Sequence, residues 1–221
     1  MNIYRAGIDI GSTTVKLVIL NDNGEILFGD YRRHHAHTQE TLNSLLKSVR
    51  KELSECDLKV KITGSGSINL GKALGIDFVQ EVVAVATALK EVAPQTDVAI
   101  ELGGEDAKII YFKGGLEERM NGVCAGGTGS FIDQMASLLQ TDATGLNDAA
   151  KDYKQIHPIA ARCGVFAKSD IQPILNQGGR KEDVAASIFQ AVVDQTVAGL
   201  TQGRELKGKI VFLGGPLHFL M

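Results

Sequence analysis

The sequence predicts an α/β protein built from two similar halves. Short apolar runs typical of strands alternate with segments whose apolar residues recur at helical spacing. The opening run I-D-I-G-S-T-T-V-K-L-V-I-L also returns later as I-E-L-G-G-E-D-A-K-I-I-Y-F. The two runs share an acid, a glycine and a lysine at equal spacing, the pairs being Asp9 with Glu101, Gly11 with Gly103 and Lys16 with Lys108. We therefore expect two duplicated halves, residues 1–95 and 96–221, whose glycine turns face each other across a cleft.

Three strands joined by tight turns open the first half: Y-R-A-G-I-D-I, V-K-L-V-I-L and E-I-L-F-G-D-Y. Thr38 is the predicted N-cap of a helix that reaches about Leu53. V-K-I-T-G then returns as a strand, and residues 82–92, rich in alanine and valine, predict a helix that Pro94 closes. The segment H-H-A-H, residues 34–37, is interpreted as a solvated turn, because no acid or thiol accompanies these histidines as metal ligands.

The second half repeats this order of strand, glycine turn with an acid, and two further strands. Helices are then expected at about 130–140, 169–176 and 182–202, and the last is predicted to be buried because it is apolar on most of its circumference. K-I-V-F-L-G-G-P-L is a strand that ends in one more glycine turn. We expect this half to be incomplete at its C-terminus, where the fold would place another helix.

Composition excludes several classes of partner. A formal net charge of -3 over 221 residues gives no basic field for nucleic acid or an anionic membrane. The N-terminus lacks the features of a signal peptide, and no stretch approaches the roughly 18 apolar residues that span a bilayer. Three cysteines, Cys56, Cys124 and Cys163, cannot complete a disulfide framework, which favours a reducing, cytoplasmic location.

The first glycine turn has the composition of a phosphate site. A strand that ends in acid-X-Gly-Ser-Thr-Thr presents backbone N–H groups and hydroxyls to anionic oxygens, and its carboxylate lies where a hydrated magnesium ion would neutralise phosphate charge. Asp9 is the candidate carboxylate, catalytic and water-linked to Mg²⁺. The candidate ATP-binding residues are Gly11, Ser12, Thr13, Thr14 and Lys16. One such motif taken alone fits a plain hairpin equally well.

Three further glycine turns favour a nucleotide site over that alternative. The turn in E-L-G-G-E-D supplies the candidate catalytic residues Glu101 and Glu105 and the candidate ATP-binding residues Gly103, Gly104 and Asp106. The turn G-G-T-G precedes a predicted helix, whose free N–H groups and dipole would offer a third anion site formed by Gly126, Gly127, Thr128 and Gly129. The last turn is assigned to the adenosine side and contains Gly214 and Gly215.

This order of motifs resembles the superfamily of acetate and sugar kinases, heat-shock chaperone ATPases and actin over nearly the whole chain. The resemblance implies two ribonuclease-H-like subdomains around a cleft for ATP and Mg²⁺, with closure coupled to hydrolysis. It leaves the chemistry open, because the superfamily includes kinases, chaperones and filaments.

Two cysteines lie close to predicted helix starts, Cys124 before the third glycine turn and Cys163 before Ser169 and Asp170. No C-x-x-C spacing is present, so spacing alone favours two inert, buried thiols. A four-iron cluster needs four thiolates, however, and a two-fold dimer supplies four from two per chain.

The surrounding motifs N-G-V-C-A-G-G-T-G-S-F-I-D and A-R-C-G-V-F-A-K-S-D resemble the two cysteine motifs of the 2-hydroxyacyl-CoA dehydratase activators, which are related to benzoyl-CoA reductase ATPase subunits. The resemblance implies that Cys124 and Cys163 hold half of a [4Fe-4S] cluster shared across a homodimer. It also implies that ATP hydrolysis drives a low-potential electron onto a dehydratase or reductase partner. The usual D-I-G-G-Q-D of that family differs here, because Glu101 replaces the aspartate and Glu105 the glutamine.

E-L-G-G-E-D and F-L-G-G-P-L are similar to the motifs of larger multidomain activase-like proteins, so we expect a fragment of such a protein. The leading hypothesis is an ATP-hydrolysing electron-transfer activator of anaerobic metabolism. Two alternatives stay open: a small-molecule kinase of the same fold with incidental cysteines, and a non-catalytic module that senses ATP or mediates assembly.

Overall fold

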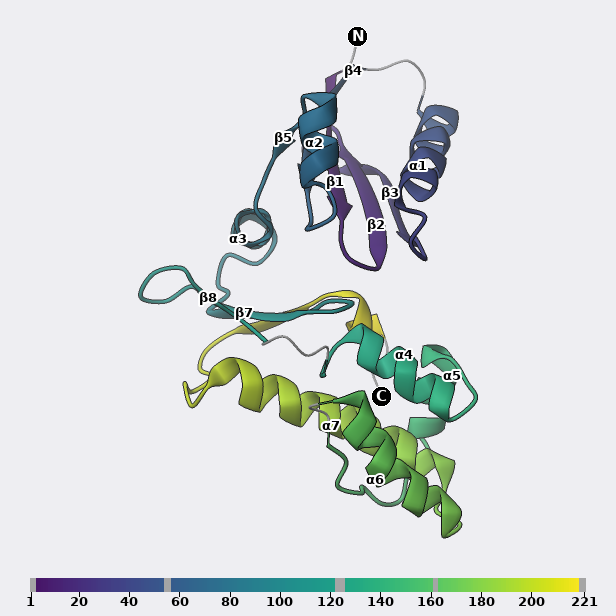
Figure 1. Cartoon of the computed structure of the whole chain (residues 1–221). Coiled ribbons are helices and arrows are strands. Elements are labelled where there is room, and N and C mark those ends of the chain that lie inside the picture. Colours follow the sequence, from purple (N-terminus) through teal and green to yellow (C-terminus); the bar gives the residue numbers. More distant parts are fainter. Residues whose placement is uncertain (1–2, 54–56, 122–125, 161–162, 219–221) are drawn as a thin grey trace. The chain divides into compact units, whose positions relative to one another are not determined.

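The computed structural model describes residues 3–53, 57–121, 126–160 and 163–218 of the chain. The chain divides into two compact units, Met1–Ala93 and Pro94–Met221. Each unit contains its own sheet, with helices packed against it, as Figure 1 shows.

The first unit is built on a five-stranded mixed sheet in the order β3-β2-β1-β4-β5. Its strands are β1 (Ile3–Ile10), β2 (Thr14–Leu20), β3 (Ile26–Arg33), β4 (Asp57–Thr63) and β5 (Asp77–Phe78). The first three run antiparallel as consecutive hairpins, whereas β4 pairs parallel to β1. Because parallel strands end at the same edge of a sheet, the segments that follow β1 and β4 are neighbours.

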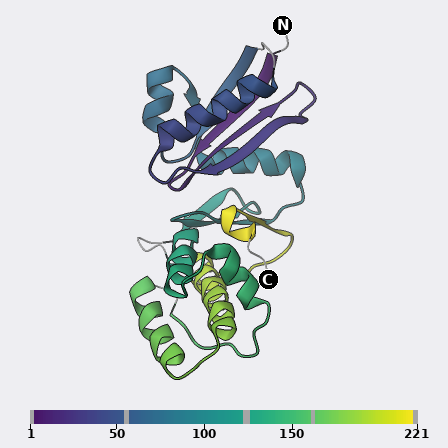
Figure 2. The same cartoon turned by 90° about the vertical axis from the view of Figure 1, so that its right-hand side faces the viewer.

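The helices of this unit are α1 (Thr38–Glu52), α2 (Ile68–Leu74) and α3 (Glu81–Val92). Helix α1 lies across one face of the sheet (Figure 2), where its buried Leu42, Leu45 and Val49 join the apolar side chains of β1 and β2 in one cluster. The N-cap of α1 is His37, one residue earlier than predicted. Helix α2 and the two-residue β5 were not predicted, because both are too short to show a clear period.

The second unit is built on a four-stranded sheet in the order β8-β7-β6-β9. Its strands are β6 (Val98–Leu102), β7 (Ala107–Tyr111), β8 (Glu117–Met120) and β9 (Ile210–Leu213). Strand β9 pairs parallel to β6, and the other pairs are antiparallel. This arrangement repeats the opening of the first unit, which confirms the predicted α/β architecture of two duplicated halves.

Helices fill the rest of the second unit: α4 (Gly129–Leu138), α5 (Ala143–Ala150), α6 (Gly164–Asn176), α7 (Lys181–Thr201) and the 3₁₀ helix η1 (Gly215–His218). Helices α4, α5, α6 and α7 share one apolar cluster, and Leu200 of α7 also packs against the sheet. The short α5 was not predicted, although Asp142 caps it by accepting the Gly145 N–H at 2.8 Å.

Helix α6 begins five residues earlier than predicted, with Cys163 as its N-cap instead of Ser169 or Asp170. The Asp170 carboxylate accepts the Ala160 N–H at 2.9 Å, so it serves the preceding segment and not a helix start. Buried Ala167 and Ile171 anchor the added turn to the apolar cluster. Tertiary packing therefore sets this boundary.

Helix α7 is more apolar than expected from the sequence, where no stretch was found to approach the roughly 18 apolar residues of a membrane span. It has 21 residues and is, by length and composition alone, apolar enough to cross a bilayer. In the structure, 56% of its apolar 18-residue stretch is buried, and α4, α5 and α6 pack around it (Figure 1). These contacts are those of a core helix.

Candidate nucleotide and cysteine sites

The acidic end of β1 is held by a lysine from the neighbouring strand. Asp9 pairs with Lys16 in the antiparallel register of β1 and β2, and the Lys16 Nζ lies 2.5 Å from the Asp9 Oδ2. Both side chains are about one-third exposed, at 31% and 36%. The carboxylate is therefore fixed in position yet accessible from solvent.

The turn between these strands presents a small polar tip. The Gly11 N–H donates to the Thr14 carbonyl at 3.0 Å, which closes the turn around Ser12 and Thr13. Ser12 is exposed, Thr13 is half-buried and Thr14 is buried at the start of β2. Of the predicted residues, Asp9, Lys16 and the turn from Gly11 to Thr14 are thus brought together in the first unit.

A second turn from this unit lies against the first and was not assigned to the site from sequence. Gly64 follows β4 with φ +96°, and a Cβ there would overlap the Ile10 carbonyl and lie 2.5 Å from the Asp9 Oδ1. The Gly66 N–H donates to the Ile10 carbonyl at 2.9 Å, and buried Ser67 donates its hydroxyl to the Gly64 carbonyl at 2.8 Å. The sequence T-G-S-G-S at the end of a strand parallel to β1 could have indicated this turn.

His34 also belongs to this region, and its interpretation as part of a solvated turn was wrong. Residues 35–37 are exposed, but His34 is buried, and its Nε2 lies 3.2 Å from the Gly11 carbonyl oxygen. The histidine-rich segment therefore has one member directed at the glycine turn.

The second unit repeats the register of acid and lysine. Glu101 of β6 lies opposite Lys108 of β7, as Asp9 lies opposite Lys16. Lys108 is buried, and its Nζ lies 3.2 Å from the carboxylate of Asp106 in the intervening turn. Glu105 is exposed in the same turn.

The start of α4 packs directly on that turn. The Gly129 N–H donates to the Gly103 carbonyl at 3.0 Å, and the Ser130 N–H donates to the Gly104 carbonyl at 2.7 Å. A Cβ on Gly129 would lie 3.4 Å from the Gly104 Cα. The prediction that this helix start offers free N–H groups is therefore wrong for Gly129 and Ser130, which hold the neighbouring turn.

The remaining glycine turns of this unit adjoin the same edge of the sheet. Gly214 has φ +109°, and a Cβ there would overlap the Leu102 carbonyl at the end of β6. Gly215 opens η1, whose Pro216 Cγ would lie 3.3 Å from a Cβ on Gly129. The second unit thus gathers the β6–β7 turn, the α4 start and the β9–η1 turn at one edge.

The buried residues Gly126, Gly127 and Thr128 lead into α4 along the surface of α7. Gly127 has φ +78°, and a Cβ there would lie 3.3 Å from the Gln195 Cγ. This turn therefore rests on α7 and depends on it for support.

The segment before Cys163 is pinned to the other end of α7. Asp183 accepts the N–H groups of Lys154 and Gln155 at 2.7 and 3.2 Å, and Ser187 accepts that of His157 at 2.8 Å. The Lys154 N–H, aided by that of Gln155, holds the pKa of the Asp183 carboxyl below its ordinary value against the opposing effect of burial. Side chains of α7 thus replace the strand partner that this extended segment lacks.

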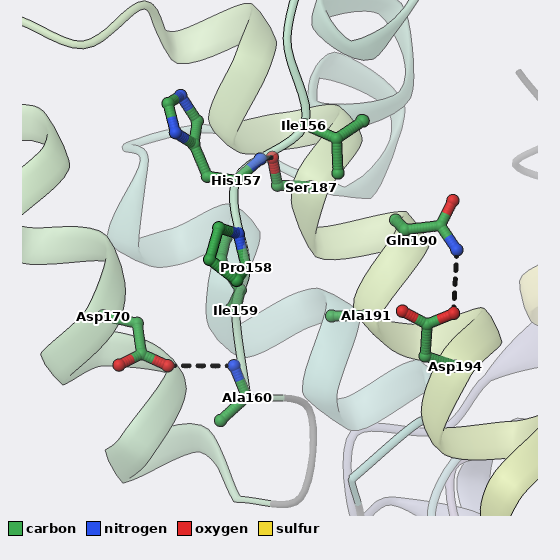
Figure 3. A pocket seen from close by; sticks show the side chains of 10 residues that line it. All are labelled: Ile156, His157, Pro158, Ile159, Ala160, Asp170, Ser187, Gln190, Ala191 and Asp194. Carbon is green, nitrogen blue, oxygen red and sulfur yellow. Dashed lines mark hydrogen bonds between the residues drawn. The ribbon is translucent and has the colours of Figure 1, made fainter.

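A pocket of about 720 Å³ lies where this segment passes over α6 and α7. Figure 3 shows Asp170 accepting from Ala160 on one side and Gln190 bonded to Asp194 on the other. Asp194 immediately precedes Gln195, which contacts the Gly127 turn. One helix therefore contacts both the glycine turn and the segment that reaches the cysteine.

Cys163 is a free, half-buried cysteine at the N-terminus of α6, and its side chain makes no capping hydrogen bond. Cys124, the other candidate ligand, and Cys56 lie outside the described residues. Within the described ranges, no three His, Cys, Asp or Glu side chains are grouped closely enough to hold a metal ion.

Comparison with known proteins places these features in a family. Residues 6–219 match the BadF/BadG/BcrA/BcrD ATPase family. The (R)-2-hydroxyglutaryl-CoA dehydratase activating ATPase of Acidaminococcus fermentans is 30% identical over 220 residues, which cover 97% of this chain and 84% of that protein.

Solved structures agree. The activator of the 2-hydroxyisocaproyl-CoA dehydratase from Clostridium difficile, with bound ADPNP, is 28% identical with a TM-score of 0.82, over 96% of this chain and 80% of that one. A ROK family glucokinase from Streptomyces griseus is 13% identical with a TM-score of 0.52, over 98% of this chain and 84% of that one, a likeness of fold alone. The predicted superfamily fold is thereby confirmed, and the chain belongs to the BadF/BadG/BcrA/BcrD ATPase family.

Proposed function

We propose that this protein is an ATP-hydrolysing iron–sulfur activator that transfers a low-potential electron to a 2-hydroxyacyl-CoA dehydratase-like or benzoyl-CoA reductase-like partner. The observation that carries the proposal is the double role of α7, which supports both the Gly127 turn and the segment leading to Cys163. In a kinase of the same fold, Cys163 would be incidental. The names of the relatives support the choice of partner.

The nucleotide chemistry is assigned to the glycine turns and their acids. Asp9 and Glu101 would position Mg²⁺ through water, and Glu105 would act on the attacking water. Asp9 fits this role, because its side chain is about one-third exposed while Lys16 fixes one of its oxygens. Mg²⁺ commonly keeps several waters and uses only one or two carboxylates beside substrate phosphates. The turns at Gly11, Gly103, Gly126 and Gly214 would hold ATP.

Cys163 has the surroundings of a thiolate ligand. It occupies the N-cap position of α6, is only half-buried, and its sulfur makes no capping hydrogen bond. Cys124 and Cys163 from two copies of the chain would supply the four thiolates that a [4Fe-4S] cluster requires. Such a cluster, when bound, supplies one-electron transfer.

The residues after Cys163 support a contact with a second copy. Val165 and Phe166 are 71% and 62% exposed on the first turn of α6. Aromatic side chains such as that of Phe166 are enriched in the core of subunit interfaces. We assign this patch to the homodimer interface around the two cysteine pairs.

Helix α7 supplies a physical route for coupling. A nucleotide that orders the Gly127 turn would press on Gln195, while Asp183 and Ser187 hold the segment before Cys163 on the same helix. Coupling requires that ATP interact differently with two conformations. A shift of α7 relative to α4 and α6 would meet that requirement.

Anaerobic reconstitution with iron and sulfide tests the cluster. The wild type should show the visible and spin-resonance spectra of a [4Fe-4S] cluster and a dimer, and Cys124→Ser and Cys163→Ser should lose both. Cys56→Ser is the matched control and should retain them. A full cluster in both Cys124→Ser and Cys163→Ser would overturn the activator assignment.

An ATPase assay tests the nucleotide site separately. Asp9→Ala should lower turnover by about 100-fold or more, the size of effect expected when a group acting on transition-state charge is removed. Asp77→Ala is the control, because Asp77 is an exposed acid at the edge of the same sheet. Unchanged turnover in Asp9→Ala would refute the assignment of the first turn.

A further inference from the structure

His34 is a buried histidine whose two ring nitrogens both engage backbone groups. The ring is 8% exposed, although the residues that follow it are exposed. The Ala36 N–H donates to Nδ1 at 3.1 Å, and Nε2 lies 3.2 Å from the Gly11 carbonyl oxygen. These contacts link the loop after β3 to the β1–β2 turn.

The contact with Ala36 determines where the neutral ring carries its proton. A backbone N–H can donate only to a ring nitrogen with a lone pair, so Nδ1 is the unprotonated nitrogen. The proton is therefore on Nε2, which donates to the Gly11 carbonyl. The hydrogen bond from Ala36 thus sets the tautomer, and this tautomer allows the ring to donate to Gly11.

The bond to Gly11 also fixes the direction of the next N–H group. The peptide unit is planar and trans, so its C=O and N–H point in opposite directions. Because the Gly11 carbonyl points at His34, the Ser12 N–H of the same peptide unit points away from it. Ser12 is exposed at the tip of the turn. Successive backbone N–H groups of such a turn are the donors that bind anions.

The backbone of the loop is unfavourable by itself and is held in place by His34. His35 and Ala36 have φ values of 45° and 66°, a left-handed conformation that non-glycine residues rarely adopt. The His34 N–H donates to the Thr13 carbonyl at 3.1 Å, and the His34 carbonyl accepts the His37 N–H at 2.6 Å. Strained backbone persists only where its surroundings over-determine it, and it concentrates at functional sites.

We infer that His34 is a positioning residue for the phosphate of the nucleotide: it orients the Gly11–Ser12 peptide so that the Ser12 N–H donates to an anionic oxygen. The inference rests on the proposed nucleotide function of this turn. His34 acts through Gly11 and does not itself contact the ligand.

Two substitutions separate the two bonds of the ring. In His34→Asn, the side-chain oxygen replaces Nδ1 and can accept from Ala36, but the side chain is too short to reach Gly11. In His34→Gln, the longer side chain can bring an amide N–H to the Gly11 carbonyl. If His34 acts through Gly11, the glutamine variant should retain the nucleotide affinity that the asparagine variant loses. If His34 only packs, the two variants should not differ in this way.

The full chain is measured for the dissociation constant of Mg²⁺-bound AMPPNP and for kcat and KM of ATP hydrolysis. His34→Asn should raise the dissociation constant and KM about tenfold, the effect of losing one hydrogen bond to a charged group, with a smaller change in kcat. His34→Gln should stay within about threefold of wild type. His35→Asn is the control, because His35 is exposed and asparagine tolerates its left-handed backbone.

Binding is measured at a temperature where circular dichroism shows each variant fully folded, so a loss of stability does not obscure the result. Wild-type affinity in His34→Asn, or equal losses in the asparagine and glutamine variants, would overturn the inference alone. Absence of nucleotide binding by the wild type would instead overturn the proposed function.

Discussion

Lys16 Nζ lies 2.5 Å from Asp9 Oδ2 across β1 and β2, at the point where β1 runs into the first glycine turn. The pair is only about one-third exposed, so solvent screens it less than a surface pair. It leaves the Asp9 carboxylate in one position beside the turn. We interpret this pair as the support of the proposed magnesium-binding acid.

Lys16→Gln should therefore lower ATP turnover by about 100-fold, since a preorganised charge near the phosphates is lost together with the support of Asp9. Steady-state ATPase rates measure the effect. Lys61→Gln is a matched control, because Lys61 makes an equally short pair with Asp77, but both partners are exposed, at 61% and 77%. Equal losses in the two variants would contradict a specific role for Lys16.

Gly64→Ala should disturb both stability and turnover. Its Cβ would overlap the Ile10 carbonyl and crowd Asp9, and its φ of +96° disfavours alanine. We expect a loss of about 1–2 kcal/mol from backbone strain and about 1–3 kcal/mol from overpacking, measured by urea unfolding. ATP turnover should fall as well, because Asp9 must move.

Gly75→Ala controls for backbone strain. Gly75 has φ +65°, and a Cβ there would meet nothing within 4 Å. This variant should lose only the strain component, about 1–2 kcal/mol, and keep its turnover. If Gly64→Ala hydrolyses ATP like Gly75→Ala, then the Gly64 turn does not support Asp9.

The repeated acid, glycine and lysine were predictable because each set lies within eight consecutive residues. Asp9 lies opposite Lys16 because Ile10 pairs with Val15 across the first turn, and Glu101 lies opposite Lys108 because Leu102 pairs with Ala107 in the same way. The duplicated fold and the family follow from these local patterns. The ion pair of Lys108 with the turn residue Asp106 was not predicted, because the strand register alone does not show it.

The contacts that sequence reasoning missed join segments far apart in the chain. Gly129 and Ser130 donate to carbonyls in a turn about 26 positions earlier, and His34 reaches back to Gly11. No periodicity reports such contacts. The start of α6 was missed for a related reason. Aspartate is a common N-cap residue, but Asp170 accepts a hydrogen bond from Ala160, and apolar packing extends the helix back to Gly164.

Phe166→Ser should weaken the proposed dimer without unfolding the chain. Phe166 is 62% exposed, so its removal costs the monomer little packing. A truncated aromatic residue at the centre of an interface should raise the dimer dissociation constant about tenfold or more. Anaerobic sedimentation of the reconstituted protein measures this constant.

Val193→Ser is the matched surface control, because Val193 is 53% exposed on α7. It should leave the dimer unchanged, and circular dichroism should give similar thermal midpoints for both variants. A dimer that tolerates Phe166→Ser would place the interface elsewhere.

Asp183→Asn should lower stability in a manner that depends on pH. The Lys154 N–H and, secondarily, the Gln155 N–H hold the pKa of Asp183 below its ordinary value. A lowered folded-state pKa means that the charged form stabilises the fold. This contribution is fully present above the ordinary pKa of about 4, and it is lost as the pH falls through the lower folded-state value.

Urea midpoints of wild type and Asp183→Asn should therefore differ most at pH 7 and converge as the pH falls below about 4. Ser187→Ala provides the pH-independent comparison. The Ser187 hydroxyl accepts the His157 N–H in the same segment before Cys163, but it does not titrate. This substitution should cost about 1 kcal/mol at every pH. If the Asp183→Asn difference is equally constant, then the carboxylate charge does not hold the segment that leads to Cys163, and α7 restrains that segment through uncharged contacts.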